Sequence, residues 1–268
     1  MITIGLVGCG TIGSRLAVEI QRQFRGTARL IGLYDRNDDT AKQLQKKLKL
    51  PVPILSPDQL IRRCQLLIEA ASANAVGQLL PKAIAHRKGM LLMSTGGLLR
   101  HPDLIRKAIA RKIPLYLPSG AIAGLDGIKA AGIGRLKSVT LTTRKHPKSL
   151  AGAPGIARAK LRLNSLRSPR TVFKGSALEA VSAFPQNINV AATLALAGMG
   201  ATRTQVRIIA DPTVHTNIHE IEAAGDFGTL FVRTENRPAR ENPKTSRLAV
   251  FSAIATLKQI LEPIRIGT

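Results

Sequence analysis

Three glycines near the start of the chain, Gly8, Gly10 and Gly13, have the spacing of a turn that binds the pyrophosphate of a dinucleotide. The first glycine of such a turn allows a tight bend, the second lets the backbone approach the pyrophosphate, and the third lets a helix pack closely on a strand. Thr11 and Ile12 fall at the start of the predicted helix, where backbone N–H groups stabilise an anion. The spacing therefore predicts a dinucleotide site formed by Gly8, Gly10, Thr11, Ile12 and Gly13.

An acidic residue follows about twenty residues after the glycines, at the end of the apolar run Leu30–Tyr34. This residue, Asp35, can accept hydrogen bonds from the hydroxyls of an adenosine ribose, which favours NAD. Arg36 follows directly, and a guanidinium can bind the 2′-phosphate of NADP through two hydrogen bonds. We therefore expect NAD or NADP as the cofactor, with NAD preferred modestly.

The elements that must position these residues alternate between apolar runs and helical patterns. Ile2–Val7 predicts a buried parallel strand before the glycines, and the spacing of Ile12, Leu16 and Ile20 predicts a helix after them. We expect further strands at Leu30–Tyr34, Leu66–Ala70, Met90–Ser94 and Ile113–Leu117, and helices at Thr40–Leu48, from Ser56, at Asn74–Arg87 and at Pro102–Arg111. This alternation predicts an α/β fold with a doubly wound parallel sheet of the Rossmann type.

Ligands of such sheets bind at the carboxyl ends of the strands. Ala71 and Ser72 follow one predicted strand, and Ser119 follows another. We therefore expect Ala71 and Ser72 to contact the cofactor, and Ser119 to contact the substrate.

The pattern changes after Pro118. We expect strands at Leu136–Arg144, Gln205–Asp211, His215–Ala223 and Thr229–Glu235, and helices at Pro185–Gly198 and from Asn242 to about Leu261. These elements predict a second domain of the α+β class with a mixed sheet. The expected boundaries are 1–120 for the dinucleotide-binding domain, 121–240 for the second domain, and 241–268 for a C-terminal helix that packs back on the first domain.

The formal net charge of the 268-residue chain is +24, and the stretch from Gly127 to Leu178 has twelve Lys or Arg and no Asp or Glu. Such a surface attracts anions, including nucleic acid. However, aromatic residues make up only 3% of the chain and there is no Trp, which leaves little material for stacking bases. We therefore interpret the charge as the basic surface of an enzyme with anionic ligands and expect no nucleic-acid partner.

Two cysteines, Cys9 and Cys64, are too few for a disulfide framework and suit a reducing compartment. The longest apolar stretch, Val190–Met199, is too short to cross a bilayer, and the N-terminus enters a strand at once. We therefore expect a cytoplasmic protein with no signal peptide and no membrane partner.

Four segments later in the chain also contain residues that could bind ligands or take part in catalysis. They are Pro118–Gly127 (PSGAIAGLDG), Phe184–Val190 (FPQNINV), Asn217–Glu222 (NIHEIE) and Glu241–Ser246 (ENPKTS). Together with the glycine turn, and in this order and spacing, they resemble the L-aspartate dehydrogenase family over essentially the whole chain.

The resemblance implies oxidative deamination of L-aspartate to iminoaspartate, and then to oxaloacetate and ammonia, with NAD or NADP accepting the hydride. It also implies a homodimer formed through the second domain. The family's catalytic histidine matches His219, and its nicotinamide-side contacts match Ala123 and Asn189.

His219 also suits this work on chemical grounds, because a histidine titrates near neutrality and can move a proton while hydride leaves the neighbouring carbon. The alternative is a histidine that only packs or hydrogen-bonds at a strand end. His215 lies four residues earlier, but the sequence lacks the acid placement of a His-Glu-x-x-His zinc motif. We therefore expect no metal and interpret His215 as a substrate-side or structural neighbour.

Three further residues are candidates for substrate binding. Asn187 lies where a helix is expected to begin, so helix capping is the competing interpretation. Lys244 and Thr245 are expected in the first turn of the last helix, where an ammonium, a hydroxyl and N–H groups could receive a carboxylate. Ordinary capping competes there as well.

Two other functions remain open at this point. One is another two-domain NAD(P) reductase of the aspartate pathway, acting on dihydrodipicolinate or homoserine. The other is a basic polyanion-binding protein that keeps a Rossmann fold without turnover. A pure binding protein has no need to keep the glycine turn, Asn189 and His219 together.

Overall fold

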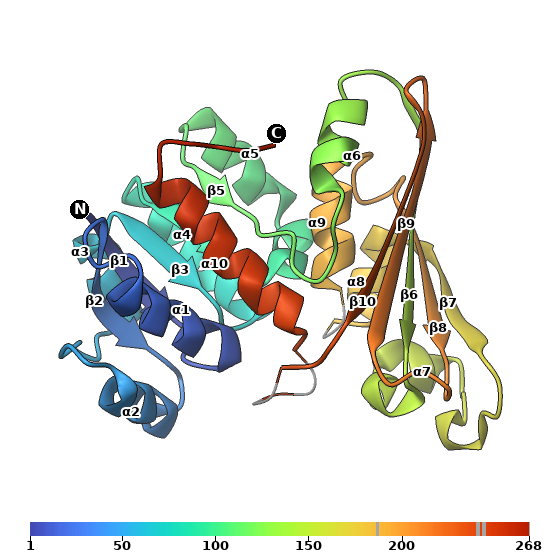
Figure 1. Cartoon of the computed structure of the whole chain (residues 1–268), viewed down its shortest axis with the longest axis horizontal. Coiled ribbons are helices and arrows are strands. Elements are labelled where there is room, and N and C mark those ends of the chain that lie inside the picture. The colour runs from blue at the N-terminus through green and yellow to red at the C-terminus, as the bar shows by residue number, and fades with distance from the viewer. Residues whose placement is uncertain (186–187, 240–241, 243–244, 268) are drawn as a thin grey trace. The chain divides into compact units, whose positions relative to one another are not determined.

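The computed structural model describes residues 1–185, 188–239, 242 and 245–267, which form two compact units. The first unit contains Met1–Pro118 and Val250–Arg265, and the second contains Ser119–Ala249 with the last few residues. Each unit has its own five-stranded sheet (Figure 1). Each described site residue can therefore be assigned to one unit.

The first sheet is parallel throughout and has the strand order β2-β1-β3-β4-β5. Its strands are β1 (Ile2–Val7), β2 (Ala28–Tyr34), β3 (Leu66–Glu69), β4 (Gly89–Leu92) and β5 (Leu115–Tyr116). The helices are α1 (Thr11–Arg22), α2 (Asp38–Lys47), α3 (Pro57–Arg63), α4 (Ala73–Ala85), α5 (Pro102–Ala110) and, from the end of the chain, α10 (Arg247–Leu261), with a 3₁₀ helix at Thr95–Arg100. The predicted Rossmann-type sheet is confirmed.

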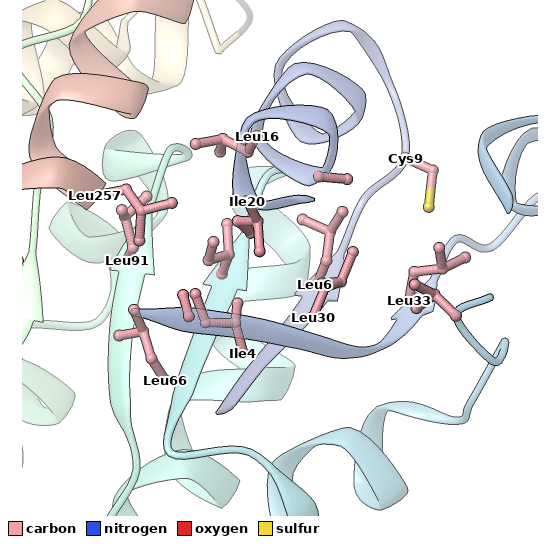
Figure 2. Packing of buried hydrophobic residues seen from close by; sticks show 14 of the residues in the cluster. Ile4, Leu6, Cys9, Leu16, Ile20, Leu30, Leu33, Leu66, Leu91 and Leu257 are labelled. Carbon is pink, nitrogen blue, oxygen red and sulfur yellow. The ribbon is translucent and has the colours of Figure 1, made fainter. Parts of the chain in front are cut away.

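One layer of the core of the first unit lies between this sheet and α1, α2 and α10. Leu16 and Ile20 of α1 and Leu257 of α10 are at most 1% exposed and pack over strand residues such as Ile4 and Leu6 (Figure 2). Each fully buried side chain of this kind stabilises the fold by about 1.5–3 kcal/mol. The helical spacing of the apolar residues in α1 thus fixes the glycine turn between β1 and α1.

Local capping explains where two helices begin. Ser56 accepts a hydrogen bond from the Gln59 N–H and Gln59 returns one to Ser56, so α3 starts where the sequence predicted. Helix α2 starts at Asp38, two residues before the predicted Thr40, because the Asn37 side chain accepts hydrogen bonds from the N–H groups of Asp39 and Thr40.

The second sheet is mixed and has the order β10-β9-β6-β8-β7, with β6 and β8 parallel and the other pairs antiparallel. Its strands are β6 (Leu136–Lys145), β7 (Arg170–Ser176), β8 (Gln205–Ala210), β9 (Asn217–Gly225) and β10 (Gly228–Asn236). Its helices are α6 (Leu125–Ala131), α7 (Pro154–Arg158), α8 (Ala177–Ala183) and α9 (Asn189–Ala197), with 3₁₀ helices at Pro147–Leu150 and Leu163–Ser165. Figure 1 shows α6, α8 and α9 on one face of this sheet, and the predicted α+β class is confirmed.

The sequence expectations for this unit are incomplete. Helices α6, α7 and α8 and strand β7 lie where no element was predicted, and α9 is shorter than the single helix expected at Pro185–Gly198. The last helix begins at Arg247 rather than at Asn242. Just before it, Ser246 forms an antiparallel bridge with Pro238 and the Thr245 carbonyl accepts a hydrogen bond from the Ala239 N–H, so these two residues are not helical.

Candidate active site

The glycine turn between β1 and α1 has open space at its middle glycine. Gly8 has a φ of +97°, and a Cβ there would collide with the carbonyl of Ala70. A Cβ on Gly13 would collide with the carbonyl of Gly8, whereas a Cβ on Gly10 would meet nothing within 4 Å. Packing within the protein thus requires Gly8 and Gly13, while Gly10 faces a space that a phosphate can enter.

Helix α1 presents its N-terminus at the same place. Gly10 is the residue that caps the helix, and it has no side chain to accept hydrogen bonds from the first turn. Thr11 and Ile12 are half-buried in that turn, and Gly13 is buried. Backbone N–H groups at a helix N-terminus favour an anion, so this turn fits a pyrophosphate.

A cavity of about 530 Å³ adjoins the turn within the first unit. It is lined by six of the residues that the sequence singled out for the cofactor: Gly8, Gly10, Asp35, Arg36, Ala71 and Ser72. They come from the ends of β1, β2 and β3, as the carboxyl-end rule for parallel sheets requires. The volume lies in the range of pockets that hold small-molecule ligands and cofactors.

The carboxylate of Asp35 also has a structural role, because it accepts hydrogen bonds from the backbone. One carboxylate oxygen accepts a hydrogen bond of 2.8 Å from the N–H of Cys9, inside the glycine turn, and the other accepts one of 3.0 Å from the N–H of Asn37. Burial, and then the charge of Asp35, raise the pKa of the Cys9 thiol to about 12. Asp35 therefore joins the end of β2 to the turn, and the Cys9 thiol stays protonated.

Sequence reasoning missed Glu69, a fully buried carboxyl at the end of β3. One of its oxygens accepts hydrogen bonds from the N–H groups of Ala71 and Ser72 at 2.8 and 2.9 Å and from the Ser94 hydroxyl at 2.8 Å. The other oxygen accepts a hydrogen bond of 3.0 Å from the Ser94 N–H. Burial raises the pKa of Glu69, although these hydrogen bonds act to lower it. Glu69 thus orders the backbone that lines the cavity. In the sequence, the feature that could have identified it is an acidic residue at the end of an apolar strand.

His219 lies in the second unit, on β9, and is only 3% exposed. Its register partners are Thr143 on β6 and Thr234 on β10, and its Nδ1 lies 3.0 Å from the Thr143 hydroxyl oxygen. The Ala121 carbonyl accepts two hydrogen bonds, one from the Thr234 hydroxyl and one from the side-chain amide of Asn236. The hydrogen bond at Nδ1 fixes the orientation of the imidazole ring.

Burial, and then the nearby charge of Lys145, lower the pKa of His219 from 6.5 to about 3. Burial also lowers the pKa of Lys145, to about 8. In the free protein at neutral pH, the imidazole is therefore neutral and the ammonium beside it is charged. A neutral imidazole can accept a proton, which is the state a general base needs.

The depressed pKa of His219 predicts an acid-labile fold. The unfolded chain binds a proton at His219 below about pH 6.5, whereas the folded protein does so only near pH 3, so stability present above pH 6.5 is lost as the pH falls. We expect the free energy of unfolding to fall more steeply in this window for the wild type than for His219→Gln, measured by urea denaturation. His215→Gln, at an exposed position, is the control. Equal slopes for the wild type and His219→Gln would contradict the prediction.

The other predicted residues fall in different surroundings. Ser119 and Thr245 are half-buried, whereas Ala123, Asn189 and His215 are exposed, and Asn189 is the first residue of α9. Thr245 lies in the turn before α10 and not in its first helical turn. Asn187 and Lys244 lie outside the described residues. The structure therefore brings the residues of the first unit together, while His215 lies apart from the buried pair formed by His219 and Thr143.

In the part of the chain that the structure describes, no three His, Cys, Asp or Glu side chains gather as metal ligands would. Among the same residues, none of the helices combines the length and the hydrophobicity that crossing a bilayer needs.

Known proteins resemble both units. Residues 126–260 match the family model described as aspartate dehydrogenase, C-terminal. Residues 8–118 match the model described as homoserine dehydrogenase, NAD binding domain. The second match covers only the dinucleotide-binding part of the chain.

The chain is also similar to whole proteins. L-aspartate dehydrogenase from Methanosarcina barkeri is 44% identical over 272 residues, and the one from Nitrosopumilus maritimus is 43% identical over 274 residues; each alignment covers 100% of both chains. The crystal structure of aspartate dehydrogenase from Thermotoga maritima gives a TM-score of 0.75 at 27% identity and covers 100% of both chains.

Proposed function

The chain belongs to the L-aspartate dehydrogenase family, and from this premise we propose how its residues carry out the reaction. The reaction is NAD(P)-dependent oxidative deamination of L-aspartate to iminoaspartate, which water converts to oxaloacetate and ammonia. The observation that carries it is the similarity to L-aspartate dehydrogenases over the full length of the chain. That similarity favours this activity over the homoserine-type reductase and over a polyanion-binding protein without turnover.

The cofactor binds along the cavity of the first unit. Its pyrophosphate lies on the turn Gly8–Gly13 and against the N-terminus of α1, and its adenosine ribose lies against Asp35 and Arg36; the cavity and the open space at Gly10 support this assignment. When bound, the nicotinamide accepts the hydride that leaves Cα of aspartate. Ala71 and Ser72 contribute the adjoining wall, and Ala123 and Asn189 contact the nicotinamide.

His219 exchanges the proton. Its Nε2 takes a proton from the substrate's amino group or from the water that attacks the imine, while Thr143 holds Nδ1 at 3.0 Å. Burial makes the free imidazole a weak base, so the two carboxylates of the bound substrate have to raise its pKa. The residues assigned to substrate binding are Ser119, Asn187, His215, Lys244 and Thr245.

The protein acts as a homodimer in the cytoplasm. Phe231 of β10 is 63% exposed on the sheet face opposite α6, beside the ion pair of Arg233 and Glu220 at 2.7 Å, and this apolar side chain supports association of two copies. Both cysteines are free and buried, which supports a reducing compartment. Light scattering of the intact protein in solution tests the dimer.

The direct test is aspartate-dependent reduction of the cofactor. We expect absorbance of the reduced nicotinamide to rise when L-aspartate is added to the protein with NAD or NADP, and oxaloacetate and ammonia to form in equal amounts. Homoserine in place of aspartate should give no signal. Turnover of homoserine but not of aspartate would replace the assignment with the homoserine-type reaction.

Asp35 and Arg36 make opposing contributions to cofactor choice. The carboxylate accepts from ribose hydroxyls and repels a 2′-phosphate, whereas the exposed guanidinium attracts it. We expect kcat/KM to favour NAD by about tenfold or less, which corresponds to roughly 1.4 kcal/mol. Arg36→Ala should penalise NADP selectively. Asp35→Asn removes the charge and keeps one of the two acceptor oxygens, so it should weaken NAD use more than NADP use.

Asp35→Ala is the control for the structural role of this carboxylate. It removes the acceptors of the Cys9 and Asn37 N–H groups, so it should weaken the use of both cofactors. Kinetics with each cofactor measure these effects. A wild-type preference for NADP beyond about tenfold would show that Arg36 outweighs Asp35.

A further inference from the structure

Glu69 ends β3 and is fully buried beside the cofactor cavity, which the next residues, Ala70, Ala71 and Ser72, line. Its carboxylate accepts hydrogen bonds from the N–H groups of Ala71, Ser72 and Ser94 and from the Ser94 hydroxyl. Bonds from two or three backbone N–H groups stabilise a carboxylate as the anion, and here they oppose the burial that raises its pKa. The geometry therefore places a buried negative charge behind the wall of the cavity.

This charge is held by hydrogen-bond donors and not by a cation. Among the described residues, no lysine, arginine or histidine forms an ion pair with Glu69. The other buried acid on a strand-end turn, Asp211, pairs with Arg144 at 2.8 Å. Because the interior screens charges weakly, the carboxylate of Glu69 can act on a ligand in the adjoining cavity.

The two strand-to-helix turns that line the cavity differ in charge. Gly10 caps α1 without a side-chain acceptor, so the positive end of this helix faces an anion without competition from a cap. Before α4, in contrast, Glu69 accepts the N–H groups of Ala71 and Ser72. The Ser72 hydroxyl accepts the N–H of Ala75 as well. The turn before α1 thus suits a pyrophosphate, whereas the turn before α4 suits a cation.

The strand order determines which part of a dinucleotide meets the turn before α4. Asp35, assigned to the adenosine ribose, follows β2, and the glycine turn follows β1, the next strand in the sheet. Strand β3 pairs with the other side of β1. A cofactor that runs from Asp35 across the glycine turn therefore extends its nicotinamide half toward the end of β3. The nicotinamide ring is a cation in the oxidised cofactor and neutral in the reduced one.

We propose that the buried carboxylate of Glu69 makes the cofactor site favour the oxidised cofactor over the reduced one, through its attraction for the positively charged nicotinamide ring. This assignment rests on the proposed function and deepens it, because it gives the site a preference between the two forms of the cofactor. The free protein then takes up the form that deamination consumes. After hydride transfer, the neutral ring no longer gains from the carboxylate, which favours release of the reduced form.

The test compares the wild type with Glu69→Gln in the full-length protein, without aspartate. Glu69→Gln removes the charge at nearly constant volume, and its amide oxygen can still accept hydrogen bonds from Ala71 and Ser72. We expect the ratio of the Kd for NAD⁺ to the Kd for NADH to rise by about tenfold. Calorimetry measures the Kd for NAD⁺, and the fluorescence of bound NADH measures the other.

Ser94→Ala is the matched control, because it removes one hydrogen bond to the same carboxylate and keeps the charge. Disorder in the cavity wall would weaken the binding of both forms by a similar factor, so the ratio separates the effect of the charge from structural damage. The ratio in Ser94→Ala should stay near the wild-type value. A ratio in Glu69→Gln within about twofold of the wild type would overturn the proposal.

Two further measurements cover a variant that does not fold. Glu69→Ala leaves room for water beside the donors that the carboxylate now satisfies, and it replaces Glu69→Gln in that case. The wild type also needs no variant: it should bind NAD⁺ at least as tightly as NADH. Binding of NADH more than about tenfold tighter than NAD⁺ would contradict the proposal.

The two ideas fail separately. A protein whose ratio of Kd values depends on Glu69, but which reduces no cofactor when aspartate is added, contradicts the proposed function alone. A protein that turns over aspartate and keeps the same ratio in Glu69→Gln contradicts only the inference.

Discussion

Replacing His219 with alanine should lower kcat by roughly 10²–10⁴ and leave the affinity for NAD nearly unchanged. The imidazole is held by Thr143 at 3.0 Å, is buried, and is neutral in the free protein, so its removal eliminates a positioned proton acceptor. The glycine turn belongs to the first unit, so the cofactor contacts assigned there are unaffected. Steady-state kinetics with aspartate, together with titration of NAD binding, measure both quantities.

Two matched variants separate proton transfer from general damage. His215→Ala changes an exposed histidine four residues away and should have a small effect. Thr143→Val keeps the imidazole but removes the hydroxyl at Nδ1, so kcat should fall less than in His219→Ala. Equal and mild losses in His219→Ala and His215→Ala would remove His219 from its role.

Replacing Gly10 with valine should abolish cofactor binding while the protein stays folded. A Cβ at Gly10 meets nothing within 4 Å, and its φ of −69° suits a branched residue, so the protein itself tolerates the substitution. The added side chain would instead fill the space that the pyrophosphate enters. Titration with NAD, followed by nicotinamide fluorescence or calorimetry, and a thermal melt check the two halves of the prediction.

Gly26→Val is the control for adding a side chain at an exposed glycine, because a Cβ there also meets nothing within 4 Å. It lies outside the residues that line the cavity, so NAD binding should be normal. Gly13→Val should unfold the turn, since its Cβ would collide with the Gly8 carbonyl. Normal NAD binding by Gly10→Val would show that the glycines form a structural turn and no cofactor site.

The sequence by itself determined the dinucleotide-binding half. The glycine spacing, the apolar run before it and Asp35 after it are all local, and the parallel topology then brings the ends of β1, β2 and β3 to one edge of the sheet. The motif around His219 is equally local. For this reason the sequence also singled out the histidine that the structure places in a buried hydrogen bond with Thr143.

Only the tertiary structure decided which polar side chains are buried beside these motifs. The sequence places Lys145 at the start of a basic stretch, and its predicted strand ended one residue earlier, at Arg144. Strand β6 extends to Lys145 because β8 pairs with it as far as Ala210. The side chain is then only 7% exposed in the folded protein. Glu69 was missed for the same reason: its partners at Ala71, Ser72 and Ser94 meet it only after β3 and β4 have paired. Burial is a property of neighbours brought together by long-range pairing, and residue type and local spacing do not record it.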